Sequence, residues 1–440
     1  MCINQLTGRG VPVAILFLPL MLLSITEVSG QSILKRVKNK VEQTVGDKVV
    51  DKADKAVAKG VDKVMGVEAE EGSQSPSPAS EIESESAVTP SSLLKAYSKY
   101  DFIPGDSVIY AADFSSEALS ELPAGWNTNG NSSVVQLEGL PGQWLRIAQK
   151  TVNLTDNRND FGADFTVEFD AFMQFTFKGW YPPSLRFGLF ASGVEDPSGN
   201  RLLSDPKGDK SLYMELSPMA NGANILLESY RKNTRHFHSP VKSAPSAQGW
   251  YARVVHVAMQ AQKERLRIWI DGEKMYDIPK AIPSEDVYNQ LFFQLGSSSY
   301  TDEQVGVYVS NIKIAKGMPD ARHQLVEEGR FSTSGILFDV GSAVIKPESS
   351  GVLNTIGEVL KQNPDMQVRI VGHTDASGEE KANQLLSEQR AEAVKGFLSS
   401  RFSIEDGRLE STGKGETEPV GDNRTREGMA QNRRVEFIRL

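Results

Sequence analysis

Two oppositely charged side chains in the last quarter of the chain could act on one ligand. Asp375 lies in the loop 372–378, which follows an alternating apolar segment, and Arg390 lies on the long helix predicted over about 379–401. A carboxylate accepts hydrogen bonds from an ammonium group, and a guanidinium binds a carboxylate through two parallel hydrogen bonds. Asp375 and Arg390 are therefore a candidate receptor for a zwitterion, such as one end of an amino acid.

The helix that carries Arg390 presents more polar groups on the same side. Asn383, Ser387 and Arg390 are four and three residues apart, so they share one helix face. The carboxamide of Asn383 can both donate and accept hydrogen bonds. Two interpretations without a ligand stay open from the residues alone: Asp375 caps the helix, or it pairs directly with Arg390.

The elements that would position these residues alternate along the end of the chain. Strands are predicted at 336–339, 366–371, 409–412 and 433–439 from their short apolar or alternating runs. A helix is predicted to begin at Lys346 and Pro347 and to end before Asn363, a long helix follows over 379–401, and a short helix or turn at 425–430. This βαβαββ order predicts an α/β domain, 319–440, with its helices on one face of a sheet.

The motifs of this last segment, in their order, resemble the OmpA C-terminal, peptidoglycan-associated family. They are Phe338-Asp339, Gly372-His-Thr-Asp375, Gly378, Asn383, Leu386-Ser387, Arg390-Ala391, Gly413 and Asn432-Arg-Arg-Val-Glu436.

The resemblance implies a ligand and roles for several residues. The ligand would be the diaminopimelate of peptidoglycan stem peptides, with Asp375 on its ammonium and Arg390 on its carboxylate. The other residues implied at the site are Thr374, Asn383, Ser387, Asp339, Arg433 and Arg434. Arg433 and Arg434 are adjacent on a predicted strand and would point to opposite faces, so we expect only one to reach the ligand.

Residues 97–318 have a different pattern, with short runs in which apolar and polar residues alternate. That period predicts an all-β domain, and the number of runs fits a two-sheet jelly-roll sandwich. Asp271-Gly272 predicts a hairpin turn between two such runs. The domain resembles the concanavalin A-like, or laminin G-like, jelly roll on the residues Asp113-Phe114, Pro123, Trp126, Trp250 and Trp269-Ile-Asp-Gly272.

Some members of that fold are glycosidases, and they carry three carboxylates on one strand. Here Glu168 and Asp170 match the first two, but Phe172 and Met173 stand where the third carboxylate would lie. A glycosidase needs two carboxyl groups, one of them protonated. We therefore predict that the domain is not an enzyme and that Glu168 and Asp170 face solvent. The alternative is a glycosidase or lectin carried on a wall-binding domain.

Two further groups in the same domain are weaker candidates. His236 and His238 lie two residues apart on a predicted strand, but no third ligand is near in sequence, so we predict surface histidines and no metal. Trp180 and Tyr181 could stack on a sugar or simply close a turn.

The first 96 residues predict export and tethering. Residues 1–30 are typical of a secretory signal, residues 31–66 predict a thin amphipathic helix, and residues 67–96 form an acidic Pro/Ser linker. Cys2, the only cysteine, precedes the apolar run and is not placed for lipidation. The alternative for residues 1–30 is an uncleaved membrane anchor. The helix at 31–66 could lie on a membrane surface, bind a partner or only space the domains.

Together these features predict a multidomain envelope protein without a cofactor. The net charge of −9 disfavours nucleic-acid binding. We expect a periplasmic protein associated with peptidoglycan and with the outer membrane, whose β domain binds a glycan or another envelope protein. In the order of its segments the whole chain resembles OmpA family proteins of Bacteroidetes-type bacteria.

Overall fold

The computed structural model describes residues 100–204, 206, 210–283 and 287–440. The predicted signal, amphipathic helix and linker lie outside these residues. The chain divides into two units, 1–84 and 85–440, and all elements described below belong to the second.

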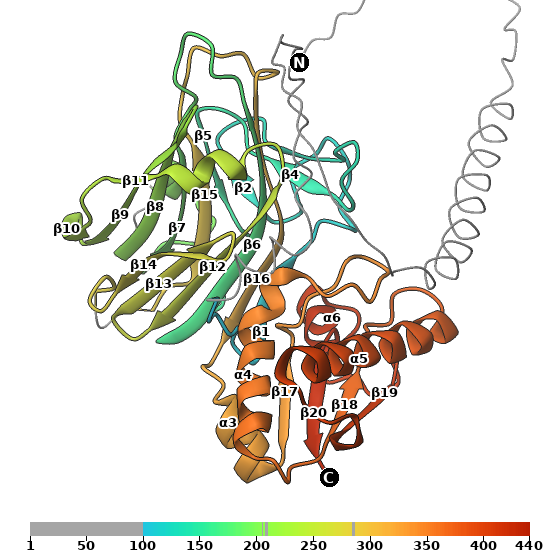
Figure 1. Ribbon diagram of the computed structural model, residues 1–440. Coiled ribbons are helices and arrows are strands. Elements are labelled where there is room, and N and C mark those ends of the chain that lie inside the picture. The colour runs from blue at the N-terminus through green and yellow to red at the C-terminus, as the bar shows by residue number, and fades with distance from the viewer. Residues whose placement is uncertain (1–99, 205, 207–209, 284–286) are drawn as a thin grey trace, which may run out of the picture. The chain divides into compact units, whose positions relative to one another are not determined.

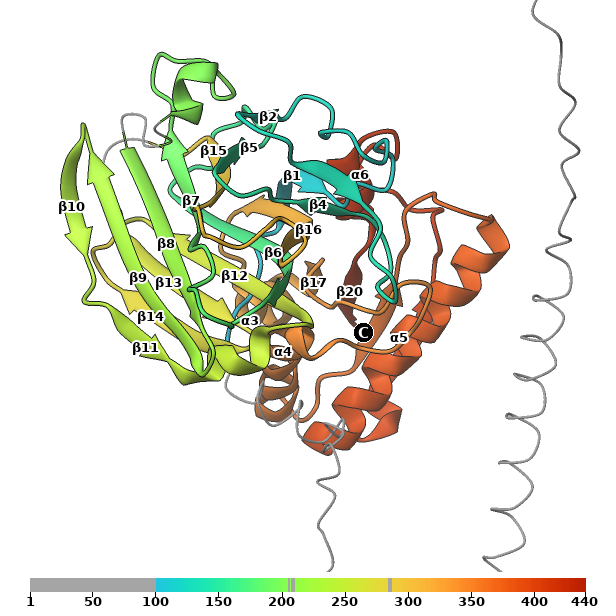
Figure 2. The ribbon, with the colours of Figure 1, turned by 90° about the horizontal axis from the view of Figure 1, so that it is seen from above.

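A two-sheet β-sandwich forms the first part of this unit (Figures 1 and 2). The first sheet has the order β14 (Glu273–Ile278), β13 (Arg265–Ile270), β12 (Val254–Gln262), β6 (Asp164–Phe175), β16 (Val305–Lys316), β4 (Trp144–Arg146) and β3 (Ser133–Val135), and β1 (Ser107–Ala112) also pairs with β16. The second has the order β10 (Thr234–His238), β9 (Gly222–Arg231), β8 (Lys210–Met219), β7 (Leu185–Ala191), β15 (Gln290–Leu295), β5 (Thr151–Leu154) and β2 (Asn127–Thr128), and β11 (Lys242–Ala244) pairs with β9. The short helices η2 (Asn200–Leu203) and η3 (Pro245–Trp250) lie between strands.

The alternation in the sequence decides which side chains fill the sandwich. On β6, Val167, Phe169 and Ala171 point into a core shared with residues of the second sheet, such as Phe187 and Phe293. The predicted hairpin turn is confirmed between β13 and β14, where Asp271 and Gly272 have φ angles of 52° and 78°.

A smaller domain with its own core follows the sandwich. It contains α3 (Ala321–His323), the π-helical turn η4 (Gln324–Glu328), β17 (Arg330–Thr333), η5 (Pro347–Ser349), α4 (Ser350–Gln362), β18 (Val368–Gly372), α5 (Glu380–Phe402), η6 (Asp406–Arg408), β19 (Leu409–Gly413), α6 (Arg426–Asn432) and β20 (Val435–Arg439). The sheet order is β17-β20-β18-β19, with β18 and β19 parallel. Figure 1 shows α4 and α5 together in front of this sheet. Among the described helices, none is long and apolar enough to cross a membrane.

The first strand of this domain is not the one predicted at 336–339. It is β17, in which Phe331 and Thr333 are buried and Phe331 stacks on Phe437 of β20. Residues 336–339 instead make one isolated bridge, between Phe338 and Ile345. A short apolar run does not reveal whether it pairs in a sheet, and here the edge of the sheet is already occupied by β17.

The outer face of the first sheet is covered, which overturns the prediction that Glu168 and Asp170 face solvent. Both carboxylates are buried, at 4% and 6% exposure. They do point away from the sandwich core, as the alternation requires. However, the C-terminal domain contributes residues to this face, and Lys346 comes within 4.0 Å of Asp170.

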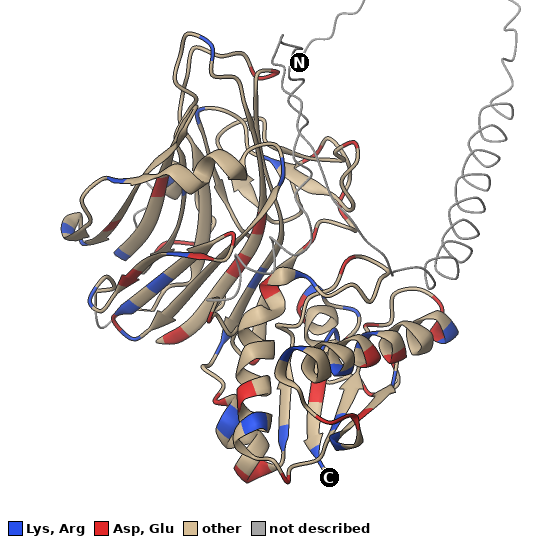
Figure 3. Ribbon diagram, in the orientation of Figure 1, with Lys and Arg blue, Asp and Glu red and all other residues tan. Residues whose placement is uncertain are grey.

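The segment that contains Phe102 and the helix α6 both contact the two domains. Phe102 lies against Trp269 of the sandwich, and its carbonyl oxygen lies where a Cβ on Gly351 of α4 would be. On α6, Gln431 accepts a hydrogen bond from the Val108 amide of β1 (2.8 Å) and donates one to the Asp106 carbonyl (2.7 Å). Figure 3 shows acidic and basic residues interspersed on both domains.

Candidate functional site

Asp375 and Arg390 line one cavity of about 530 Å³. Of the other predicted site residues, Thr374, Asn383, Arg433 and Arg434 also line it, whereas Ser387 and Asp339 do not. The cavity has a second wall that the sequence did not predict, formed by residues of β1, β6, β12 and β16 of the sandwich.

The carboxylate of Asp375 is fixed at the end of β18. One oxygen, Oδ2, lies 2.5 Å from Nη1 of Arg433, and the other, Oδ1, accepts a hydrogen bond from the Ser377 amide at 2.9 Å. Asp375 therefore neither caps α5 nor pairs directly with Arg390, the two alternatives that needed no ligand. Its side chain is 10% exposed, so the carboxylate is largely removed from water but still borders the cavity.

Arg390 is held in place by neutral groups. Its Nε donates to the Ser342 carbonyl at 3.0 Å, and its guanidinium carbon lies 4.9 Å from the centre of the Phe338 ring. No carboxylate of the described residues lies within 4.0 Å of it. Burial and the positive charge of Arg433 lower the pKa of Arg390, and Asp375 opposes this. A cation with its charge unpaired at a cavity wall is a site for an anion.

Asn383 and Ser387 of α5 shape the site through the backbone. The Asn383 amide donates to the carbonyls of Asp375 (3.2 Å) and Ser377 (3.1 Å), which fixes the loop onto the helix. The Ser387 hydroxyl donates to the Gln384 carbonyl and accepts from the Gly415 amide, both within 2.8 Å, and the residue is fully buried. Ser387 is thus a positioning residue, and its place on the Arg390 face of the helix does not bring it to the cavity.

Close packing of α5 on the sheet explains two glycines of the motif. A Cβ on Gly372 would lie 2.3 Å from the Ser387 carbonyl oxygen, and one on Gly413 would lie 2.3 Å from the Ser387 hydroxyl. Contacts this short do not occur between real side chains, so both strands require glycine where the helix crosses them. The helix can then hold Arg390 beside the loop that carries Asp375.

Thr374 and His373 are both buried next to Asp375. The Thr374 amide donates to the Gly415 carbonyl at 2.9 Å, while its hydroxyl has no hydrogen-bond partner among the described residues. Nε2 of His373 lies 3.7 Å from Glu436. His373 therefore lies beside Glu436 of β20, and the Thr374 hydroxyl is available at the cavity wall.

Arg433 and Arg434 both line the cavity, so the lining does not single out one of them, and which of them reaches the ligand stays a prediction. Both precede β20, and Arg433 is the C-terminal cap of α6 with ψ 82°, so the alternation of a strand does not apply to them. Only Arg433 pairs with Asp375. Arg434 is 5% exposed and lies against Glu436 at 2.8 Å. Burial acts to raise the pKa of Glu436, but His373 and Arg434 outweigh it and lower the pKa to about 2.

The sandwich wall contains a buried cluster of charges that sequence reasoning did not connect. His256 of β12 lies between Asp170 (Nδ1 to Oδ1, 2.8 Å) and Glu168 (Nε2 to Oε1, 3.5 Å), and Lys313 lies 2.9 Å from the other oxygen of Glu168. These residues come from three strands that are far apart in sequence. Only their pairing, such as His256 opposite Asp170 in the β12–β6 register, brings them together.

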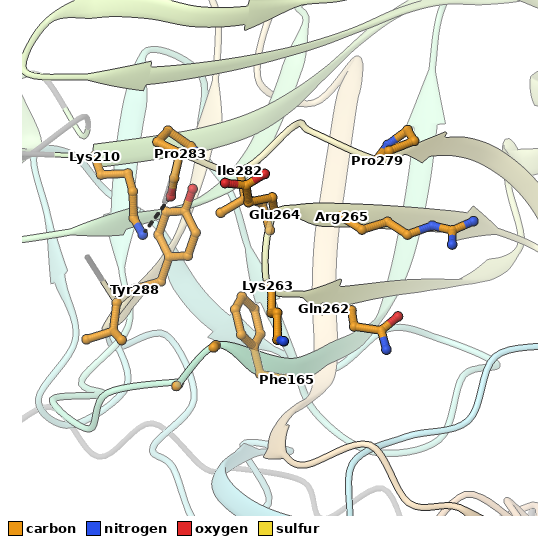
Figure 4. Close-up of a pocket in the computed structure, with 13 residues that line it drawn as sticks. Phe165, Lys210, Gln262, Lys263, Glu264, Arg265, Pro279, Ile282, Pro283 and Tyr288 are labelled. Atoms are coloured by element: carbon orange, nitrogen blue, oxygen red, sulfur yellow. Dashed lines mark hydrogen bonds between the residues drawn. The ribbon is translucent and has the colours of Figure 1, made fainter. Parts of the chain in front are cut away.

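The remaining candidates of the sandwich do not form a comparable site. His238 contacts Glu228 at 3.0 Å, and the described residues contain no group of three or more potential metal ligands. A second cavity, of about 500 Å³, lies in the sandwich (Figure 4). Its buried Lys210 ammonium lies 4.3 Å from the centre of the Tyr288 ring and donates to the Pro283 carbonyl, so the protein itself holds this charge.

Comparisons with known proteins place the C-terminal domain. The model of the OmpA family matches residues 337–433. Outer membrane porin F of Pseudomonas aeruginosa is 41% identical over 101 residues, which are 23% of this chain and 29% of that protein. Peptidoglycan-binding protein ArfA of Mycobacterium bovis is 39% identical over 103 residues, which are 23% of this chain and 31% of that protein.

A solved structure is also similar to about a quarter of the chain. The peptidoglycan-associated lipoprotein of Burkholderia pseudomallei is 29% identical over 25% of this chain and 89% of that one, with a TM-score of 0.23. The chain spans less than a third of the length of the two curated relatives above. The matched residues include Asp375, Arg390 and Arg433, which line the cavity, so residues 337–433 of this chain form an OmpA family domain.

Proposed function

We propose that this chain is a non-catalytic protein of the cell envelope that binds peptidoglycan through diaminopimelate of the stem peptide. The observation that carries the proposal is the guanidinium of Arg390, which has no carboxylate partner among the described residues and lies in the same cavity as Asp375. The peptidoglycan-binding and peptidoglycan-associated relatives of the OmpA domain support the ligand class.

The free end of diaminopimelate carries an ammonium and a carboxylate on one carbon, and each has a partner here. The two terminal nitrogens of Arg390 point their hydrogens along one edge, which fits the carboxylate. Asp375 accepts from the ammonium, and Arg433 at 2.5 Å keeps the aspartate in position. The Thr374 hydroxyl offers a further hydrogen bond at the same wall.

A binding role also fits the electrostatics of Glu168 and Asp170 better than hydrolysis does. Burial acts to raise the pKa of both carboxylates. At Glu168 this effect is outweighed by Lys313 and His256, and at Asp170 it is outweighed by His256, so the pKa of each group is lowered. The acid of a glycosidase needs a raised pKa to hold its proton. We therefore treat this pair as part of the domain interface and propose a periplasmic, wall-associated protein near the outer membrane, whose sandwich has the concanavalin A-like jelly-roll fold.

Peptidoglycans that differ in one group test the proposal. The full chain is expected to sediment with sacculi of the diaminopimelate type. It is not expected to sediment with sacculi in which lysine replaces diaminopimelate, because the lysine side chain has the ammonium but lacks the carboxylate for Arg390. Sacculi in which that carboxylate is amidated are a matched control. Equal binding to all three would contradict the assignment.

A glycan is the second candidate ligand, and we propose that it binds a separate surface of the sandwich. Trp180 and Tyr181 are 64% and 77% exposed. Their loop is braced, because the Tyr300 hydroxyl donates to the carbonyls of Trp180 (2.7 Å) and Lys178 (3.0 Å). Two exposed aromatic rings on a fixed loop are suited to stacking on a sugar.

Removing these rings is expected to abolish any glycan retention by the sandwich. In a glycan array, the double variant Trp180→Ala/Tyr181→Ala should lose the signals of the full chain and still sediment with sacculi, since neither ring lines the Asp375 cavity. Val194, also fully exposed on the sandwich, gives a control as Val194→Ala. An unchanged array would show that the aromatic loop only closes a turn.

A further inference from the structure

The cavity that contains Asp375 and Arg390 is larger than one end of an amino acid requires. Its volume of about 530 Å³ lies in the range of about 300–1,000 Å³ that holds drug-sized ligands. The additional wall belongs to the sandwich and includes Asn311, Lys313 and His256. This wall lies outside the OmpA family domain, so the family match says nothing about it.

We propose that the sandwich wall and Lys346 form a second subsite, which holds the carboxylate of the stem-peptide residue next to diaminopimelate. This inference rests on the proposed function and extends it to a longer part of the peptide. Three observations lead to it: the charge of the cavity, the surroundings of Lys346, and a bulge in β16.

The lining of the cavity contains more cations than carboxylates. Its lining residues include four Asp or Glu and six Lys or Arg. Within the lining, Glu168 pairs with Lys313 and Asp375 pairs with Arg433. Two further lining cations pair with carboxylates that lie outside the lining: Arg434 with Glu436 and Arg426 with Asp156. All four distances are within 2.9 Å. Two cations remain. Arg390 has no carboxylate within 4.0 Å, and Lys346 has only Asp170, at 4.0 Å. The cavity is therefore suited to a ligand with two anionic groups.

Both of these cations are attached to the same loop. Arg390 donates to the carbonyl of Ser342 and lies over Phe338, and Phe338 forms the isolated bridge with Ile345, the residue before Lys346. The Lys346 amide also donates to the Leu337 carbonyl at 2.8 Å. The loop thus contacts the Arg390 side chain and fixes the backbone from which the Lys346 side chain extends, so it helps to hold both cations at the cavity.

On the opposite wall, β16 departs from regular pairing at the cavity. Its register with β6 shifts between Ser310 and Lys313, and Asn311 has a left-handed φ of 52°. Such a bulge re-aims a side chain, and asparagine is one of the few residues besides glycine that adopt the left-handed region readily. The Asn311 amide nitrogen donates to Asp170 at 2.8 Å, and its oxygen accepts no hydrogen bond from the described residues. Asn311 is thereby held at the cavity with an acceptor available for a peptide N–H.

The chemistry of the stem peptide supplies a matching ligand. Diaminopimelate is joined to the γ-carboxyl of a glutamate, whose α-carboxylate stays free in the unamidated peptide. A ligand that places the end of diaminopimelate between Asp375 and Arg390 carries this second carboxylate on the adjacent residue. Lys346 would bind it, and the Asn311 oxygen would accept from the connecting amide.

Calorimetry with two small ligands and the full chain tests the subsite. The ligands are meso-diaminopimelate and the dipeptide γ-glutamyl-diaminopimelate. The wild type is expected to bind the dipeptide about tenfold more tightly, which is typical of one partly exposed charge-assisted hydrogen bond. Lys346→Gln should remove most of this ratio, and Asn311→Gly should reduce it by about threefold.

Matched variants separate the subsite from general effects of charge or backbone. Lys361→Gln removes a lysine at the exposed end of α4, and Asn233→Gly changes an exposed asparagine that also has a left-handed φ, 62°. Both should leave the ratio at the wild-type value. Equal affinity for the two ligands, or an unchanged ratio in Lys346→Gln, overturns the subsite while leaving the proposed function intact. Absence of binding to both ligands overturns both.

Discussion

Replacing Arg390 by alanine is expected to weaken binding of the full chain to diaminopimelate-type sacculi by at least about 30-fold. Truncating one partner of a largely buried charge pair costs about 2–5 kcal/mol, and each 1.4 kcal/mol is a factor of ten in affinity. Asp375→Ala should have an effect of the same size, because it leaves the ligand ammonium and Arg433 without a carboxylate. Sedimentation over a range of sacculus concentrations measures both.

Two further variants of α5 make this result specific. Arg390→Lys keeps the charge but loses the two parallel hydrogen bonds and the contact with Phe338, so an intermediate affinity is expected. Arg401→Ala removes an exposed arginine from the last turn of the same helix and should bind as the wild type does. If Arg390→Ala also binds like the wild type, the cavity is not the peptidoglycan site.

Replacing His256 by leucine is expected to destabilise the sandwich by about 3–5 kcal/mol, the usual cost of removing one partner from a buried ion pair. The change leaves Asp170 without its closest cation and Glu168 with only Lys313. For a domain of this size the melting temperature should fall by roughly 6–20 °C in calorimetry. His236→Leu, at an exposed position of β10, is the control and should melt within about 2 °C of the wild type.

The same histidine predicts how the stability depends on pH. Burial alone lowers the pKa of His256, but its hydrogen bonds to Asp170 and Glu168 outweigh this and raise the pKa from 6.5 to about 10. A raised pKa means that the folded protein holds the proton more tightly than the unfolded chain does. The contribution of His256 is therefore complete below pH 6.5 and is lost as the pH rises to about 10.

The stabilisation from Glu168 and Asp170 has the opposite pH dependence, because it is lost at acid pH. Their lowered pKa values stabilise the fold above their unfolded values of 4.5 and 3.8, and this stabilisation is lost as the pH falls below them. The melting temperature of the wild type should thus exceed that of His256→Leu most at about pH 6 and least near about pH 10. A constant difference between the two proteins over this range would contradict the assigned protonation.

Much of the OmpA domain could be predicted from local sequence. The helix from Pro347 to Gln362, the long helix α5 and the strand before Asp375 follow from apolar periodicity and from breakers such as Asn363. The first strand could not be located in this way, because 330–333 contains a single apolar residue, Phe331, whereas 336–339 contains three. Contact with Phe437 decided between them.

The sequence alone determined which groups could meet a zwitterion, since Asp375 and Arg390 lie on adjacent elements and their types fix the chemistry. Tertiary structure decided what surrounds them. It paired Asp375 with Arg433, left Arg390 without a carboxylate, and covered Glu168 and Asp170. The physical reason is that periodicity is a local property of the sequence and shows only which face of a helix or strand is apolar. The partner of a polar face depends on residues such as Asp170, His256 and Lys346, which are distant in the chain and meet only when the domains pack.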